Sequence, residues 1–541
     1  MGGLRVAVHD AAGAVNGADH RPSVPPTLER PKRDGFGDYS TNAAMLLAPA
    51  LGAPPREIAE RLAVELASSL GADLDRTEVA GPGFLNLFLS DQWHRRALAA
   101  MLAASERFGA DGAASPERIL VEFVSANPTG PLVAASGRHA AYGDALSRIL
   151  AFHGHEVQRE YYFNDAGSQI RLLGESVRAR ARGEPVPEGG YEGDYVAELA
   201  AEIPGAADAD AGALATLAVE LLFARIKATL DRYGVSFDNF FSERLLHEGS
   251  PNAVERALES LIEGGHAYRS EGALWLRTTT FGDDKDRVLE RSSGEPTYLA
   301  ADVAYLLNKR DRGFDRQVSP MGADHHGYAV RLKAAFAALG GDPDTLEVPL
   351  LQFVHLVEGN QKAAMSKRRG DFVTLDELLD EIGVDATRFF MLQRSHDRTV
   401  DLDIDLARRE SPENPVFYVQ YAHARIASIL GRAGADRVAG ALAAVDEWEA
   451  GPLEDAERDL IKQLIAFPEE VAEAAERRAP HRIATYALEL AQVFTAFYRD
   501  CRVVGATPAA VESFRIALSV AAKQTIASAL GLLGVSAPEV M

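Results

Sequence analysis

The stretch that decides the fold is residues 117–165, ERILVEFVSANPTGPLVAASGRHAAYGDALSRILAFHGHEVQREYYFND. It opens with a nearly all-apolar run, 119–124, which is typical of a strand buried on both faces. The Asn-Pro, Thr-Gly and Pro of 125–131 break regular structure, and apolar residues at helical spacing follow from Gly137. Gly154 is expected to end that helix, and 156–163 predicts the next strand. This order predicts a unit of a doubly wound sheet, whose ligands bind beyond the strand C-termini.

The loop that precedes this helix is the first candidate for ligand chemistry. A helix N-terminus presents unpaired N–H groups and the positive end of the helix dipole, which together suit a phosphate group. Many Rossmann-type units nevertheless bind no nucleotide. The geometry alone therefore leaves a nucleotide site and a purely structural unit both open.

Length and composition favour a soluble protein of several domains. The chain has 541 residues, too many for a single core, so about two to four domains are expected. Hydrophobic residues make up 47% and charged residues 25%, which is ordinary for a globular protein. No apolar run approaches the ~20 residues of a membrane span, and no signal-peptide pattern is present. The single cysteine, Cys501, excludes an internal disulfide. We therefore expect a cytoplasmic protein.

The charge balance is strongly acidic. A net charge of −23 argues against broad, nonspecific nucleic-acid binding, which depends on neutralising phosphates. Basic clusters at 30–33, 367–369 and 477–482 could still line a local groove, although each cluster alone is more often a solvated face.

The residues around the central loop are more specific than its geometry. They include Glu122, Phe123, Ser125, Asn127, Pro128, Thr129, Gly130, Pro131 and Leu132, followed by Gly137, Arg138, Tyr142, Gly143 and Asp144. This series resembles the signature of the class I arginyl-tRNA synthetases, and almost the whole chain is similar to a bacterial member of that family. One departure is serious. The family carries His-x-Gly-His after the Pro-Leu pair, where this chain has Val133, Ala134, Ala135 and Ser136.

The resemblance implies an α/β fold with three parts. A Rossmann-type, doubly wound parallel-sheet catalytic domain is expected at 113–400, with an insertion at about 175–270. A small N-terminal α/β domain is expected at 1–112, and an all-α anticodon-binding bundle at 401–541. Within these parts, 1–30 has little periodicity, 182–212 looks like a surface insertion with a linker-like section, and 432–456 is a poorly patterned connection.

A Tyr-x-x-x-Asp pair is the second informative motif. Tyr298 and Asp302 lie four residues apart, so on a helix they share one face. In the family this pair binds arginine, and a fixed carboxylate suits the planar guanidinium. Without the family context, the pair is better interpreted as an ordinary first helical turn. The arginine site that the resemblance implies consists of Glu122, Ser125, Asn127, Tyr298, Asp302 and His325.

The segment 364–368, Ala-Met-Ser-Lys-Arg, resembles the class I Lys-Met-Ser-Lys-Ser loop, with alanine for the first lysine. A mobile cation there would meet the α-phosphate and the departing pyrophosphate. The catalytic residues that the resemblance implies are Lys367, Ser366, Arg368 and Ser136. The implied ATP site consists of Pro131, Leu132, Val133, Ala135, Ser136, Gly137, Gly322, His326, Met365 and Lys367. Mg²⁺ would accompany ATP through phosphate oxygens and water. No protein-held metal is expected, because His325 and His326 lack further ligands at usable spacing.

Two regions resemble the tRNA-binding parts of the family. Residues 31–90 resemble its additional N-terminal domain, and 414–425 resembles the opening of its anticodon-binding bundle. A core stripe from Ile483 to Cys501 is predicted there, with exposed neighbours that contact unpaired bases. The implied tRNA-binding residues are Asp38, Tyr39, Asn42, Tyr486, Gln492, Tyr498 and Arg499. The first three are interpreted equally well as capping and packing residues.

The implied reaction is ATP-dependent activation of L-arginine to arginyl-adenylate, followed by transfer to the 3′ end of arginine tRNA by a monomer. The altered motif keeps three hypotheses open: an active synthetase with a changed phosphate site, a protein that binds tRNA without ATP chemistry, and an engineered or erroneous substitution. Losing one stabilising donor typically costs ~10²–10³-fold in rate. His139 either supplies a replacement donor or is a surface helix residue, and the sequence favours the second interpretation.

Overall fold

A five-stranded parallel sheet forms the centre of the molecule. The computed structural model describes residues 2–17, 25–31, 35–165, 167–359, 361–362, 373–444, 448 and 451–541. The strand order is β13-β11-β5-β6-β7, and every neighbouring pair is parallel. The strands are β5 (Arg118–Glu122), β6 (Glu156–Phe163), β7 (Asn239–Ser242), β11 (Arg316–Val318) and β13 (Leu346–Glu347). The predicted strands at 119–124 and 156–163 are therefore confirmed, at the middle of a sheet whose apolar centre excludes water.

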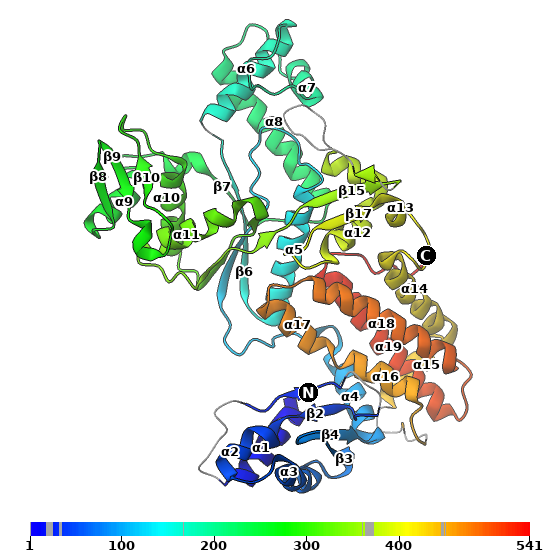
Figure 1. Ribbon diagram of the computed structural model, residues 1–541. Coiled ribbons are helices and arrows are strands. Elements are labelled where there is room, and N and C mark those ends of the chain that lie inside the picture. The colour runs from blue at the N-terminus through cyan, green and yellow to red at the C-terminus, as the bar shows by residue number, and fades with distance from the viewer. Residues whose placement is uncertain are drawn as a thin grey trace.

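The helix predicted after the loop is α5 (Ser136–His153), which crosses between β5 and β6 (Figure 1). It ends at Gly154, whose φ of 110° lies in the left-handed region that glycine adopts without strain. At Gly143 the helix approaches the sheet so closely that a Cβ would lie 2.1 Å from the Phe123 ring. Helices α12 (Leu375–Leu392) and α17 (Phe467–Glu476) cover its other sides. A helix enclosed in this way has a fixed N-terminus, which is the end that faces the ligand side of the sheet.

A buried ion pair locks α5 to α12. Asp144 and Arg388 are both fully buried and paired, and the Arg388 guanidinium also donates to the carbonyl oxygens of Leu533 and Tyr233 at 2.9 and 3.0 Å. Arg148 adds a second bond to Asp144 at 2.7 Å. Arg388 and Arg148 both bond Asp144 Oδ2, so removing Asp144 would leave the buried Arg388 charge uncompensated, whereas removing Arg388 would leave Asp144 with Arg148.

Two sub-structures flank the central sheet (Figure 1). One consists of the helices α6 (Ser168–Arg182), α7 (Asp194–Glu202) and α8 (Ala211–Arg232), which share a hydrophobic cluster of their own. The other combines an antiparallel sheet with three helices: β8 (Ala267–Ser270), β9 (Ala273–Leu276), β10 (Arg287–Glu290), α9 (Ala253–Glu263), α10 (Tyr298–Asp311) and α11 (His326–Ala338).

Two smaller sheets continue the fold beyond β11. The first pairs β12 (Met321–Gly322) with β14 (Leu350–Leu351). The second is ordered β16-β15-β17. Its strands are β15 (Val354–Glu358), β16 (Gln361–Lys362) and β17 (Val400–Asp403).

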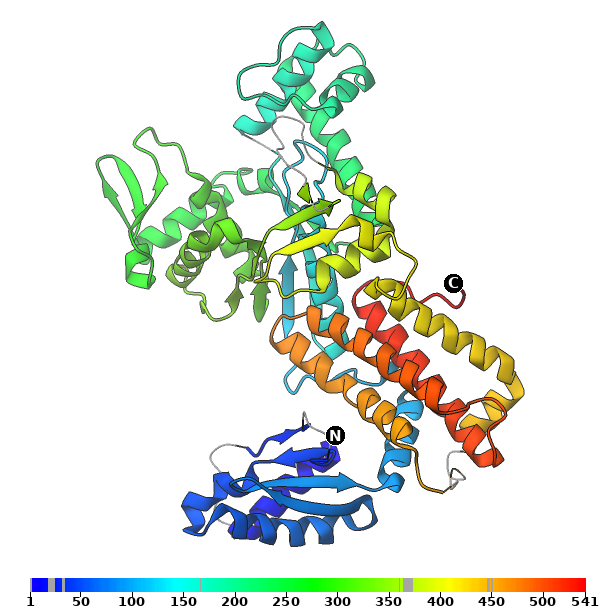
Figure 2. The same cartoon turned by 45° about the vertical axis from the view of Figure 1, so that its right-hand side comes forward.

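The N-terminal part is a four-stranded sheet with helices packed on it. The sheet order is β1-β2-β4-β3, with β1 (Leu28–Glu29), β2 (Tyr39–Thr41), β3 (Leu74–Ala80) and β4 (Phe84–Leu89). The helices are α1 (Gly2–Asn16), α2 (Ala43–Leu51) and α3 (Pro55–Leu70). Figure 2 shows this part below the C-terminal bundle, which lies between it and the central sheet.

The C-terminal region is helical, as predicted. Its helices are α13 (Ile404–Ala407), α14 (Pro415–Ala433), α15 (Ala435–Ala443), α16 (Asp455–Leu464), α17, α18 (His481–Asp500) and α19 (Ala509–Leu532). The predicted core stripe on α18 is confirmed, because Ile483, Ala487, Leu490, Phe494, Phe497 and Cys501 are all buried.

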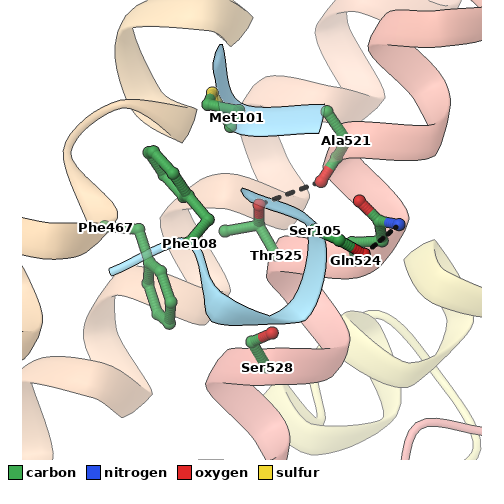
Figure 3. A pocket seen from close by; sticks show the side chains of 8 residues that line it. All are labelled: Met101, Ser105, Phe108, Phe467, Ala521, Gln524, Thr525 and Ser528. Atoms are coloured by element: carbon green, nitrogen blue, oxygen red, sulfur yellow. Dashed lines mark hydrogen bonds between the residues drawn. The ribbon is translucent and has the colours of Figure 1, made fainter. Parts of the chain in front are cut away.

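Helix α4 (Asp91–Ala104) links the N-terminal part to this bundle and packs on α16 and α19. Asp91 accepts from Arg458 at 2.8 Å, and Asp38 pairs with Lys462 at 2.7 Å. The turn after α4 closes a cavity of only about 10 Å³ against α17 and α19, and Figure 3 shows the Gln524 amide bonded to Ser105 there. Such a volume holds about one water molecule, so this cavity is a packing defect and too small for a ligand.

The expectation that 1–30 is irregular was wrong, and the two other poorly patterned regions each contain a helix. Residues 2–16 form α1, because Leu4, Val8, Ala11 and Val15 give it a buried face. The predicted surface insertion at 182–212 contains α7, held by buried Val196 and Leu199. The connection at 432–456 contains α15. In α1 and α7 a few apolar side chains at helical spacing outweigh a composition rich in small and polar residues.

Among the described residues, none of the helices combines the length and apolar character that crossing a bilayer would require.

Candidate active site

A cavity of about 850 Å³ opens at the carboxyl edge of the central sheet. It lies where β5 ends and α5 begins, with the segments 319–328 and 351–355 opposite. Residues from all four places line it: Glu122, Val124, Ser125, Val133, Ala135, Ser136, Arg138, His139, Ser319, Pro320, Met321, Gly322, Asp324, His325, Tyr328, Leu351, Gln352, Phe353, Val354 and His355. This position is the one that doubly wound sheets use for ligands.

The backbone at the end of β5 is held in an unusual conformation. Val124 and Ser125 have φ values of 67° and 43°, in the left-handed region that residues with a Cβ rarely adopt, least of all a β-branched valine. The Ser125 hydroxyl donates to Glu122 Oε1 at 3.2 Å and accepts from the Tyr162 amide at 3.2 Å. Strain of this kind collects at ligand sites, where it fixes side-chain direction.

Glu122 is paired with a buried lysine. Lys309 Nζ donates to Glu122 Oε2 at 2.6 Å and lies 4.2 Å from the centre of the Tyr305 ring. The Ser319 hydroxyl also donates to Glu122, at 3.2 Å. The Lys309 side chain is 3% exposed. This pair neutralises Glu122, so a cationic ligand needs further carboxylates.

The predicted arginine ligand Asp302 does not itself line the cavity and lies behind Tyr328, which does. It is half-buried on α10, and the hydroxyl of Tyr328, a cavity-lining residue, donates to it. Burial, with the negative charges of Glu243 and Glu122, raises the pKa of Asp302 to about 7. The carboxylate therefore sits where its own charge is poorly stabilised, which is the condition a bound cation relieves.

A second carboxylate close to Asp302 is Glu243, which the sequence analysis did not single out. It follows β7 and accepts from the Tyr162 hydroxyl at 2.7 Å. Burial raises the pKa of Glu243 as well, with a contribution from the charge of Asp165. Together, Asp302 and Glu243 form an acidic pair; the positive charges of Lys309 and Arg331 only partly offset the rise in the pKa of Asp302, and Lys309 is hydrogen bonded to Glu122.

The start of α5 is docked on the segment that follows the Ala-Met-Ser-Lys-Arg motif. Ala134 N donates to Val373 O at 2.9 Å, and Leu375 N donates to Leu132 O at 2.8 Å. Arg138 is buried and donates to the carbonyl oxygens of Gln352 and Ser395, at 2.7 and 2.9 Å. Burial lowers its pKa to about 10. The helix start therefore has one well-defined position at the cavity.

Several predicted site residues meet at the cavity, and others do not. Those that line it are Glu122, Ser125, Val133, Ala135, Ser136, Gly322 and His325. Buried Leu132 and Gly137 pack beneath the helix start, and Pro131 is half-buried beside them without lining the cavity. Ser366, Lys367, Arg368 and Met365 lie outside the described residues.

Three further predicted residues lie elsewhere. Asn127 bonds Gln169 at 3.1 Å, away from the cavity lining. His326 faces a neighbouring hollow of about 480 Å³ next to Arg478. Tyr298, the first residue of α10, is 68% exposed. His139 was expected on the surface and is instead half-buried in the cavity wall. The burial of α5 explains this difference.

The N-terminal tRNA candidates are engaged within the protein. Asp38 accepts from the Leu89 amide at 2.6 Å, and the Asn42 side chain accepts from the Thr27 amide at 2.9 Å. Tyr39 is 1% exposed and lies beneath Arg30. These contacts are of the capping and packing kind.

The candidates on α18 differ among themselves. Tyr486 was expected to be exposed, which is wrong: it is buried and donates to Gln463 O at 2.9 Å. Gln492 and Arg499 are exposed, and Tyr498 is half-buried. The Arg425 guanidinium lies 4.7 Å from the Tyr421 ring centre and 5.8 Å from that of Tyr498. This aromatic and cationic surface is of the type that stacks unpaired bases.

No group of three or more His, Cys, Asp or Glu side chains within the described ranges is placed to hold a metal ion.

Comparison with known proteins agrees with this geometry. Residues 215–406 match the model of the class I (R) tRNA synthetase catalytic domain, 4–89 the arginyl-tRNA synthetase N-terminal domain, and 419–541 the DALR anticodon-binding domain. The fold and its cavity thus define a class I aminoacyl-tRNA synthetase.

Curated relatives specify the family. The arginine–tRNA ligases of Frankia alni and Desulfosudis oleivorans are each 46% identical to the chain, covering 98% and 95% of it and 97% and 94% of their own lengths. A solved structure of a putative arginyl-tRNA synthetase from Campylobacter jejuni is 34% identical, with a TM-score of 0.77 over 84% of this chain and all of that one. The chain belongs to the arginyl-tRNA synthetase family.

Proposed function

We propose that this chain is an arginine–tRNA ligase that activates L-arginine with ATP and transfers it to the 3′ end of arginine tRNA. The observation that carries the proposal is the acidic pair Asp302 and Glu243 behind a cavity at the sheet edge. Each has a raised pKa, and Lys309 is committed to Glu122. A guanidinium is the cation that fits, because its five planar donors can bond two carboxylates and a tyrosine hydroxyl oxygen together.

The chemistry that follows needs positioning and charge stabilisation more than a protein nucleophile. An oxygen of the arginine carboxylate attacks the α-phosphorus of ATP, and the bond to the β-phosphate bridging oxygen breaks to release pyrophosphate. A ribose hydroxyl of the tRNA then attacks the acyl carbon, and AMP leaves. Mg²⁺ would accompany ATP through phosphate oxygens and water and would supply charge stabilisation at the phosphates.

The phosphate side of this site is unusual. We infer that Val133, Ala134, Ala135 and Ser136 stand where the family has His-x-Gly-His. At the helix start only Ser136 then offers a side-chain donor, and Ala135 adds a methyl group beside the nucleotide. Lys367, with Ser366 and Arg368, remains the predicted mobile cation, and Met365 the predicted ATP contact.

The tRNA is proposed to contact the aromatic and cationic surface around Arg425, with Gln492, Tyr498 and Arg499 nearby. Asp38, Tyr39, Asn42 and Tyr486 are proposed to act indirectly, since their side chains already bond within the protein. We further propose a cytoplasmic monomer, as expected from the sequence.

Arginine- and tRNA-dependent ATP–pyrophosphate exchange tests the proposal. Exchange above background that requires arginine supports it. Background exchange with intact tRNA binding would favour a tRNA-binding protein without ATP chemistry. In that case the triple variant Val133→His, Ala135→Gly and Ser136→His should raise the rate, provided that the rest of the site is sound.

A further inference from the structure

We propose that His139 is a catalytic residue that donates a hydrogen bond to the phosphates of ATP during adenylate formation. This inference rests on the proposed function and adds a residue to that same site. His139 would stabilise the negative charge of the ATP phosphates at the start of α5.

The position of His139 follows from helix geometry. It lies three residues after Ser136, so the two side chains share one face of α5. Both line the cavity, together with Val133 and Ala135, which carry no side-chain donor. His139 therefore places a second side-chain donor on this face, one helical turn after Ser136.

The other nitrogen-bearing side chains near His139 at the cavity already have partners. Arg138 donates to two backbone carbonyl oxygens, and His325 lies 3.5 Å from an oxygen of Asp324. His139 makes no hydrogen bond or ion pair with any residue that the structure describes. An imidazole in the cavity wall with both nitrogens uncommitted is available to a ligand.

The electrostatic surroundings suit an incoming anion. Burial, helped by the positive charge of Arg138, lowers the pKa of His139 to about 4, while Asp324 acts in the opposite direction. The ring is thus neutral near pH 7 and donates one N–H. A bound triphosphate supplies negative charge, which raises the pKa of the imidazole and strengthens that bond. Negative charge that moves onto the leaving pyrophosphate would strengthen it further.

Arg138 has a positioning role in this scheme. Its two bonds tie the first turn of α5 to the segments at 352 and 395, so the neighbouring His139 points into the cavity without any bond of its own. Preorganisation of this kind is what makes a single donor effective.

The test compares His139→Ala and His139→Gln with the unchanged protein. His139→Ala should lower kcat for arginine activation by ~10²–10³-fold, with L-arginine and tRNA affinities unchanged. His139→Gln keeps an N–H donor and should recover part of the loss. His153→Ala, which removes a buried imidazole from the other end of the same helix, is the matched control and should leave kcat unchanged.

Equilibrium binding separates this inference from the proposed function. His139→Ala should weaken ATP binding by at least about tenfold and leave adenosine binding unchanged, because only the phosphates contact the imidazole. ATP affinity equal to that of the unchanged protein overturns the proposal, whether or not the unchanged protein catalyses exchange. Activation within threefold of the unchanged protein would overturn it too. Thermal unfolding of each variant shows whether a loss comes from misfolding.

Discussion

Asp302→Asn should make the ligand-free protein more stable while it destroys arginine binding. The pKa of Asp302 rises from 3.8 to about 7 on folding, a change of about 3 units, worth up to about 4 kcal/mol at 1.36 kcal/mol per unit. Because the folded-state pKa is raised, the native state holds the proton more tightly than the unfolded chain. Stability is therefore lost as pH rises from about 4 to about 7, and the loss remains complete above pH 7. Asparagine carries no charge and removes this loss, while it still accepts from Tyr328.

Thermal unfolding at several pH values measures the effect. The variant should unfold a few degrees above the unchanged protein at pH 8, and the difference should shrink toward pH 4. Millimolar L-arginine should raise the midpoint of the unchanged protein and not that of the variant. Asp311→Asn, at the exposed end of the same helix, should change neither quantity. A difference that is independent of pH, or an arginine-stabilised variant, would refute the reasoning.

Two other predictions concern the arginine site, and a third concerns the buried ion pair of α5 and α12. Binding of L-arginine should tighten about tenfold from pH 6 to pH 8 as Asp302 ionises, with proton release near pH 7 in calorimetry; equal affinity at both pH values would contradict this. Glu243→Gln should weaken L-arginine by ~10–100-fold, in line with a charged hydrogen bond worth about 1.5–3 kcal/mol, and leave ATP binding unchanged; an arginine affinity equal to wild type would exclude Glu243 from the site. Arg388→Ala should lower the free energy of unfolding in urea by about 3–5 kcal/mol, because it removes a buried partner of Asp144 and leaves the carbonyl oxygens of Leu533 and Tyr233 without their donor; a loss below about 1 kcal/mol would show that Arg148, which also bonds Asp144, compensates.

The central unit was predictable because its signals are local. An apolar run gave β5, a helical stripe with a glycine stop gave α5, and the bounds of β6 matched the expected 156–163. The core stripe of α18 was equally clear, since helical spacing and burial coincide there. Prediction from apolar periodicity failed where small residues interrupt the helical pattern. For that reason α1 and α7 were missed, although each buries apolar side chains.

The site was only partly predictable because its parts converge from distant segments. Glu122 and Asp302 carried motif signals, whereas Lys309 reaches Glu122 across 187 residues and Glu243 follows a different strand. No spacing rule connects such positions. The direction of His139 likewise depends on the packing around α5, which a single stretch of sequence does not contain.

The most direct test of the account is the amino-acid specificity of charging with arginine tRNA. L-arginine should be attached in an ATP-dependent reaction, and citrulline, which has nearly the same shape but no positive charge, should be attached at least ~100-fold less efficiently because it leaves the carboxylates uncompensated. Comparable charging of citrulline, or no charging of arginine with active tRNA, would contradict the claim that Asp302 and Glu243 select a guanidinium.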